Sequence, residues 1–207
     1  LPPVDSVKLI TNEIRKIVAV DPAFTGDVCK IGGIVNGLIE QERSIHPTKT
    51  NEIVLETKVI ARAIETKNII IDTGFNPGVA DALAADEAGY NVIRFNGAAK
   101  PMDERFYANM RAEGYAYAAR QVSKLRVARP KSQELIRQLP VAARYKTTTG
   151  GKLLIVPKQE IRKILGRSPD DADMWMMGIY GLQKVEPESA KKQSKSQVPN
   201  FVVLGVG

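Results

Sequence analysis

The sequence predicts an α/β fold with a mixed five-stranded sheet flanked by helices. Two short apolar segments, 16–21 and 68–72, have the length of buried strands, and each ends in an aspartate. The pair Asn36-Gly37 joins the strand-like runs 28–35 and 38–45, which is typical of an antiparallel hairpin. Beyond this hairpin, helical and strand-like segments alternate, and such alternation indicates parallel strands with right-handed crossovers. A dinucleotide-binding sheet would alternate from its first strand, so the early hairpin argues against one.

The remaining elements follow from hydrophobic periodicity and from residues that begin or end helices. Gly89 closes an alanine-rich helix, Pro140 is expected to stop another, and Gly150-Gly151 marks the turn of a further hairpin. The expected positions are helices over 48–66, 77–89, 103–125, 132–139, 157–165 and 168–182, a fifth strand over 91–95 and an added β-hairpin over 144–156.

The chain has 207 residues, enough for one α/β domain, which we expect over 16–183. A linker over 1–15 and a flexible tail over 184–207, rich in lysine, serine and glutamine, are expected at its ends. Because the sequence lacks an initial methionine, we expect it to be a fragment of a longer protein. It contains no run of about 18 apolar residues, so no transmembrane helix or membrane association is expected.

Composition favours an anionic partner and excludes cysteine-based sites. Thirty Lys and Arg residues against 23 Asp and Glu give a net charge of +7, which favours binding to nucleic acid, although it also serves simple solubility. The single Cys29 excludes an internal disulfide and a cysteine-based zinc site, and it fits a cytoplasmic setting.

Acidic residues stand at positions that the predicted fold brings to one edge of the sheet. Asp21 and Asp72 end apolar strands, and the carboxyl ends of strands are where ligands bind in open α/β sheets. In the segment GRSPDDAD, Ser168 suits a helix N-cap, so that Asp170 and Asp173 share one helix face. Asp171 would then point about 100° away from Asp170.

Each acid has a simpler explanation when it is taken alone. Acids in a first helical turn complement the helix dipole, and Asp-Pro or Asp-Thr-Gly segments start turns. Asp173, however, precedes the apolar run Met174 to Met177, where a buried carboxylate needs a partner. Together the acids predict a group of carboxylates with no Lys or Arg between them, whose repulsion hard divalent ions relieve. Two Mg²⁺ or Mn²⁺ ions about 4 Å apart would support phosphodiester hydrolysis.

Several segments resemble the nuclease domain of the large terminase subunit of tailed bacteriophages. They are VAVDPAFTGD, IIIDTGFNPGVADAL, RFNGAAKP followed by NMRAE, and GRSPDDADMW, and the resemblance runs from about residue 16 to residue 182. It implies a ribonuclease H-like fold and a metal-dependent endonuclease that cuts double-stranded viral DNA concatemers during genome packaging. By this resemblance Asp21, Asp72 and Asp173 are catalytic, and they bind two Mg²⁺ or Mn²⁺ ions together with Asp170, or with Asp171 in its place.

The resemblance also implies partners and a location. They are double-stranded DNA, an N-terminal packaging ATPase domain, a terminase small subunit, a portal protein and the host cytoplasm. Cations on the expected hairpin, Arg144, Lys146 and Lys152, are candidates for binding the DNA backbone, the alternative being a solvated basic hairpin. Asp27 is a candidate to support the acids without binding metal.

Two other functions remain open from the sequence. A different ribonuclease H-like nuclease, of the junction resolvase or transposase type, would carry the same acids. A non-catalytic DNA-binding module of a packaging machine would not need all four.

Overall fold

A mixed five-stranded sheet in the order β3-β2-β1-β4-β5 forms the centre of the protein. The computed structural model describes residues 13–24, 28–74, 76–124, 126–127 and 130–188. The strands are β1 (Lys16–Asp21), β2 (Cys29–Val35), β3 (Leu38–Ile45), β4 (Asn68–Asp72) and β5 (Asn91–Phe95). β1, β2 and β3 pair in antiparallel fashion, whereas β4 lies parallel to both β1 and β5. The predicted mixed sheet is therefore confirmed.

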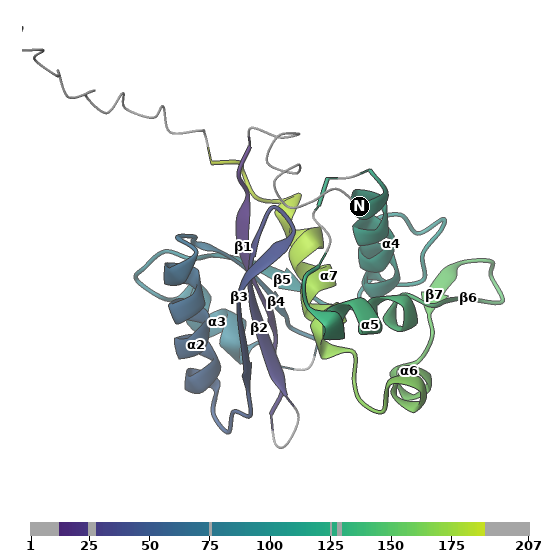
Figure 1. Ribbon diagram of the computed structural model, residues 1–207, viewed down its shortest axis with the longest axis horizontal. Helices are drawn as coiled ribbons and strands as arrows, with labels where there is room; N and C mark the ends of the chain where they lie inside the picture. The colour runs from purple at the N-terminus through teal and green to yellow at the C-terminus, as the bar shows by residue number, and fades with distance from the viewer. Residues whose placement is uncertain (1–12, 25–27, 75, 125, 128–129, 189–207) are drawn as a thin grey trace, which may run out of the picture.

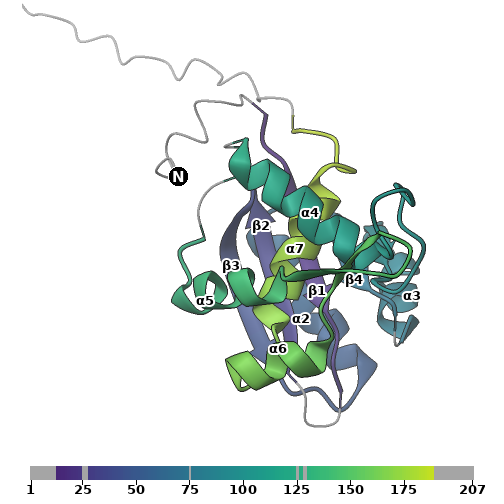
Figure 2. The ribbon, with the colours of Figure 1, turned by 90° about the vertical axis from the view of Figure 1, so that its right-hand side faces the viewer.

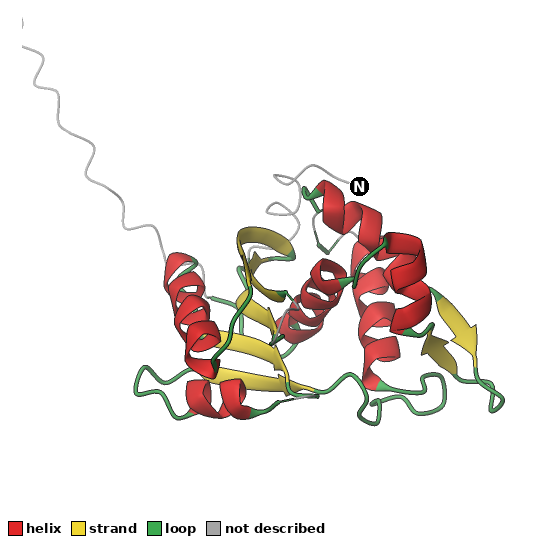
Figure 3. Cartoon of the chain, turned by 90° about the horizontal axis from the view of Figure 1, so that it is seen from below, coloured by secondary structure: helices red, strands yellow, loops and turns green. Residues whose placement is uncertain are grey.

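Helices cover both faces of this sheet, as Figures 1 and 3 show. α2 (Thr50–Ala63) and α3 (Gly78–Ala84) pack on one face, and α7 (Asp170–Leu182) packs on the other. α4 (Met110–Ser123) and α5 (Gln133–Ala142) contact the outer side of α7, as Figure 2 also shows. The predicted hairpin is present as β6 (Tyr145–Thr147) and β7 (Leu153–Ile155), followed by α6 (Lys158–Leu165).

Alternation along the central strands decides which way their final aspartates point. On β1, Ile17 and Ala19 pack on the α7 side, while the intervening Val18 belongs to the core beneath α2 and α3. Because successive side chains of a strand point to opposite faces, Asp21 lies on the α7 side. The same spacing places Asp72 with Ile70 on that side.

α7 is buried from Asp171 to Leu182, which explains its run of methionine, tryptophan and glycine. Gly178 faces Ile34 and Gly181 faces Ile17, and a methyl group at either glycine would overlap these side chains. The helix therefore approaches the sheet closely. Trp175 Nε1 donates a hydrogen bond to the carbonyl of Gly37 (3.0 Å), which ties α7 to the β2–β3 turn.

Several helix boundaries differ from the predicted ones for local reasons. α4 begins at Met110 instead of residue 103, because the side chain of Asn109 caps it by accepting a hydrogen bond from Ala112 N (2.9 Å). α5 continues through the exposed Pro140 and ends at the buried Ala142. The predicted stop at Pro140 was wrong, because burial of Ala142 and the packing of α5 on α7 outweigh the one backbone hydrogen bond that a proline cannot donate. α7 starts two residues later than expected, with Pro169 at its N-cap position.

The structure describes only part of each end of the chain. Most of the predicted linker 1–15 and tail 184–207 lies outside the described residues, and so does Asp27. The described ends, Ile14 and Glu188, form an isolated antiparallel bridge. Among the helices that the structure describes, none has the length and apolar character required to cross a membrane.

Candidate functional site

Four aspartates lie near one another where β1 and β4 end and α7 begins. Asp21 ends β1, Asp72 ends β4, and Asp170 and Asp173 lie in the first turn of α7. The charges of Asp72, Asp170 and Asp173 all act on Asp21 and raise its pKa, which places the four carboxylates in one electrostatic group. The fold thus brings together all four acids that the sequence singled out at this edge.

Asp21 is the least compensated of the four. Its pKa is raised well above the ordinary value of an aspartate, first by burial and then by the three neighbouring carboxylates, while Lys158 opposes the shift. Among the described residues, Asp21 forms no ion pair. The folded protein therefore disfavours the ionised form of this carboxylate unless a further positive charge is present.

Asp72 and Asp170 are held locally by short-range hydrogen bonds. Gly74 N donates to Asp72 Oδ1 (2.8 Å), which makes a tight turn directly after β4. Burial raises the pKa of Asp72, and the charge of Asp173 adds to that shift, although the hydrogen bond from Gly74 opposes it. Burial likewise raises the pKa of Asp170, against a hydrogen bond from Ser168.

Asp173 differs because cations already surround it. Arg111 on α4 binds its carboxylate with two nitrogens (3.0 and 3.1 Å to Oδ1), and Lys158 Nζ lies 3.2 Å from Oδ2. The hydroxyl of Tyr115 donates a third contact (2.7 Å). Burial would raise the pKa of Asp173, but Arg111, Lys158 and Tyr115 together hold it below the ordinary value. The expectation that no Lys or Arg lies between the acids was therefore wrong.

The donor set at this edge fits a hard divalent cation at three of the four acids. Asp21, Asp72 and Asp170 offer carboxylate oxygens, and within the described residues none of them forms an ion pair. Across those residues no three acidic, histidine or cysteine side chains are close enough together to hold an ion as they stand. A bound ion would therefore require these side chains to move toward one another, and Asp173 would share its charge with Arg111 and Lys158.

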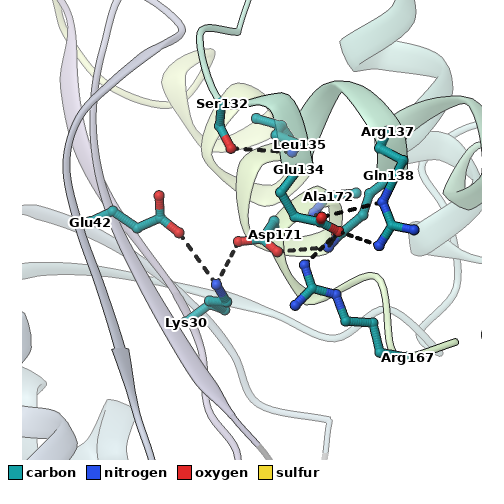
Figure 4. Close-up of polar contacts among 10 residues, drawn as sticks. All are labelled: Lys30, Glu42, Ser132, Glu134, Leu135, Arg137, Gln138, Arg167, Asp171 and Ala172. Carbon is teal, nitrogen blue, oxygen red and sulfur yellow. Dashed lines mark hydrogen bonds and ion pairs between the residues drawn. The ribbon is translucent and has the colours of Figure 1, made fainter. Parts of the chain in front are cut away.

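Asp171 points away from the cluster and anchors the start of α7. Its carboxylate lies 2.6 Å from Lys30 Nζ on β2 and accepts a hydrogen bond from Gln138 Nε2 on α5 (2.7 Å). Gln138 Oε1 in turn accepts from Ala172 N (3.1 Å), so one buried amide holds both a side chain and the backbone of α7. Figure 4 shows this network, in which Lys30 lies between Asp171 and Glu42. Asp171 therefore points away from Asp170 and Asp173, as the helical spacing predicted.

Other residues considered from the sequence lie outside this cluster. Arg144 and Lys146 are exposed on the β6–β7 hairpin, and Lys152 is half-buried there. The segment around Gly150 and Gly151 is the predicted turn of this hairpin, with Gly151 at φ +78°.

Sequence reasoning missed four residues that shape the site: Arg111, Tyr115, Lys158 and Gln138. None of them belongs to a pattern that local spacing makes visible. Arg111 is 62 positions from Asp173 along the chain, and only tertiary packing brings them together. The one available signal was the buried position of Asp173, which required a charged partner of unknown identity.

Comparisons with known proteins support the fold. No protein-family model matches the chain, and no curated protein sequence matches it. Among solved structures, the nuclease domain of the large terminase subunit of bacterial virus Sf6 aligns with a TM-score of 0.64 and 19% identity, over 80% of this chain and 87% of that one. The large terminase nuclease of the thermophilic phage G20c aligns with a TM-score of 0.59 and 14% identity, over 82% of this chain and 83% of that one.

A third structure agrees with these two. The large terminase nuclease domain of Thermus phage P74-26 aligns with a TM-score of 0.55 and 15% identity, over 80% of this chain and 78% of that one. Three phage nucleases thus share the arrangement of sheet and helices described above. This chain has the ribonuclease H-like fold of the nuclease domains of phage large terminases.

Proposed function

We propose that this chain is a metal-dependent endonuclease that cuts double-stranded viral DNA concatemers during genome packaging. The observation that carries the proposal is the state of Asp21, a carboxylate at the end of β1 that forms no ion pair within the part of the chain that the structure describes. A structural carboxylate in such a position would be expected to have a direct partner, whereas a metal ligand acquires one on binding.

Divalent metal ions are the group that fits these acids. Structures of the Sf6 nuclease domain contain calcium or manganese, and one of the G20c nuclease contains magnesium. In this chain Asp21, Asp72, Asp170 and Asp173 would hold Mg²⁺ or Mn²⁺, and two ions are proposed. Such ions lower the pKa of bound water and stabilise charge on the leaving oxygen in phosphodiester hydrolysis.

The surrounding residues of this chain prepare the site. Arg111 and Tyr115 fix the orientation of Asp173, because four hydrogen bonds from two groups leave its carboxylate little freedom. The side chain of Lys158 is 45% exposed, so its ammonium can approach an entering phosphate while it remains beside Asp173. Arg144, Lys146 and Lys152 on the hairpin are proposed to bind the backbone of the duplex.

The remaining assignments extend the same proposal. The partners proposed from the terminase likeness are an N-terminal packaging ATPase domain, a terminase small subunit and a portal protein. The proposed location is the cytoplasm of the bacterial host.

Cleavage of plasmid DNA tests the proposal directly. The protein should nick or cut a supercoiled plasmid in Mn²⁺ or Mg²⁺, and EDTA should stop the reaction. Asp21→Asn should abolish cleavage, while Glu87→Gln, which removes an exposed charge far from the cluster, should cut normally. Undiminished cleavage in EDTA, or by Asp21→Asn, would refute the proposed chemistry.

A second measurement does not depend on activity. Mn²⁺ should raise the melting temperature of the wild-type protein and of Glu87→Gln, and it should raise that of Asp21→Asn much less, because a bound ligand stabilises the folded state in proportion to its affinity. Equal stabilisation of all three proteins would place the ion elsewhere.

A further inference from the structure

A polar cleft of about 500 Å³ lies beside the acidic cluster, between the sheet and the connection from α6 to α7. Lys30, Ser44 and His46 on β2, β3 and the loop that follows line one side. Arg162 near the end of α6, together with Arg167 and Ser168 in the loop that follows, lines the other. All six of these side chains can donate hydrogen bonds, and three of them are cationic at neutral pH.

The cations of the cleft are held in different ways. Lys30 is paired with Asp171 (2.6 Å) and Arg167 with Glu134 (2.6 Å), so that both are fixed in place, as Figure 4 shows. Arg162 is exposed and forms no ion pair or side-chain hydrogen bond within the described residues. A guanidinium whose donors are free is a suitable partner for a phosphate, which it can bind through two parallel hydrogen bonds.

The cleft opens onto the acidic cluster at Asp170. This residue lines the cleft, and its charge acts on Asp21. α6 makes a second connection, because Lys158 contacts Asp173 and Arg162 follows four residues later on the same helix face. If one phosphate of a DNA strand lies at the acids beside Lys158, the neighbouring phosphate would lie close to Arg162, which is about one helical turn from Lys158 along α6.

We infer that this cleft binds a phosphate of the DNA strand adjacent to the bond that is cut. The inference rests on the proposed nuclease function and adds to it a place for the strand. Arg162 makes the main contact. Lys30 and Arg167, each already paired with a carboxylate, add donor groups that are held in place, and Ser44, Ser168 and His46 donate hydrogen bonds at the walls. The contact reads the backbone and not the bases, so it is independent of sequence.

Arg162→Gln tests the inference against a matched control, Lys163→Gln. Lys163 is the next residue of α6, is also exposed and does not line the cleft, so the two variants lose the same charge from the same helix. Binding of a fluorescent duplex is measured by anisotropy in EDTA, where neither cleavage nor metal binding contributes. Because both side chains are exposed, both variants should melt at the wild-type temperature.

Arg162→Gln should weaken binding several-fold, and Lys163→Gln should not. Losing one phosphate contact lowers the slope of log affinity against log salt by about 0.9, so the deficit of Arg162→Gln should shrink about threefold between roughly 50 and 200 mM salt. Equal affinities and equal slopes for the two variants would overturn the inference.

Inorganic phosphate distinguishes a strand site from a site for a free anion. If phosphate stabilises the wild type against heat but not Arg162→Gln, while both bind the duplex equally, the cleft takes a free anion and the inference is wrong. Failure of the nuclease proposal is a separate result, namely the absence of metal-dependent cleavage by the wild type. If the wild type cuts DNA but Arg162→Gln and Lys163→Gln bind the duplex equally well, only the inference about the cleft is refuted.

Discussion

Neutralising Asp171 should lower the free energy of unfolding of the protein without removing a proposed catalytic group. Asp171→Asn keeps an oxygen that can accept a hydrogen bond from Gln138, but it loses the ion pair with Lys30. Both members of this pair are buried, because the side chain of Asp171 is 7% exposed and that of Lys30 is 14% exposed. Breaking a buried pair costs about 3–5 kcal/mol, and Lys30 keeps a longer contact with Glu42 (3.4 Å), so we expect a loss of about 2–3 kcal/mol. For a domain of this size that corresponds to a fall of about 4–12 °C in melting temperature.

The neighbouring substitution Asp170→Asn is the matched control. Burial and two neighbouring carboxylates raise the pKa of Asp170, so removing its charge should leave the metal-free protein as stable as before or more so. Both variants are unfolded in urea at neutral pH, and cleavage is then measured at a temperature where each is folded. Asp171→Asn should retain most of the cleavage rate, whereas Asp170→Asn should lose much of it. A fully stable but inactive Asp171→Asn would refute the assignment of Asp171 as an anchor.

Three further predictions concern the charges of the site and of the whole chain. Asp72→Asn should abolish cleavage and leave the melting temperature unchanged or higher, because burial raises the pKa of Asp72 and an asparagine can still accept the hydrogen bond from Gly74. A fall of several degrees in melting temperature would instead show that Asp72 is a structural turn residue. The pKa of Asp21 is higher in the folded protein than in the unfolded chain, so the free energy of unfolding should fall as the pH rises above about 4. Asp21→Asn should flatten this dependence when urea unfolding is measured across a pH series. Equal pH dependence in the wild type and the variant would contradict the prediction. Duplex binding by the wild type should weaken steeply with salt and be equal for two unrelated sequences, and a salt-insensitive, sequence-selective complex would favour a site-specific binder instead.

The central sheet could be predicted because local patterns determine it. The sequence shows short apolar runs over 17–20 and 69–71, a turn at Asn36-Gly37 and acids at two strand ends, and each of these features depends on neighbours along the chain. The α7 side of Asp21 and Asp72 then follows from alternation, and the separate direction of Asp171 follows from the helical turn. The fold class and the grouping of the acids needed nothing further.

The charges that surround Asp173 could not be predicted in the same way. Arg111 comes from α4, Lys158 from α6 and Tyr115 from the next turn of α4, and only tertiary packing brings these residues to Asp173. From the sequence alone, Arg111, which is followed by Ala112 and Glu113, is indistinguishable from an exposed arginine on a helix surface. The identity of a buried acid's partner is a tertiary property, even where the need for a partner is plain from the sequence.

The opposite pKa shifts of Asp21 and Asp173 assign different tasks to two carboxylates of one cluster. Arg111 and Lys158 already neutralise Asp173, so a divalent ion gains less there, and the main effect of this acid is to fix the start of α7 relative to α4 and α6. Asp21 carries the charge that burial and its neighbours oppose, and an ion that binds it removes this cost. In the proposed nuclease, two acids whose environments move their pKa values in opposite directions would have separate roles. The affinity for metal should therefore depend most strongly on Asp21, and the geometry of the site on Asp173.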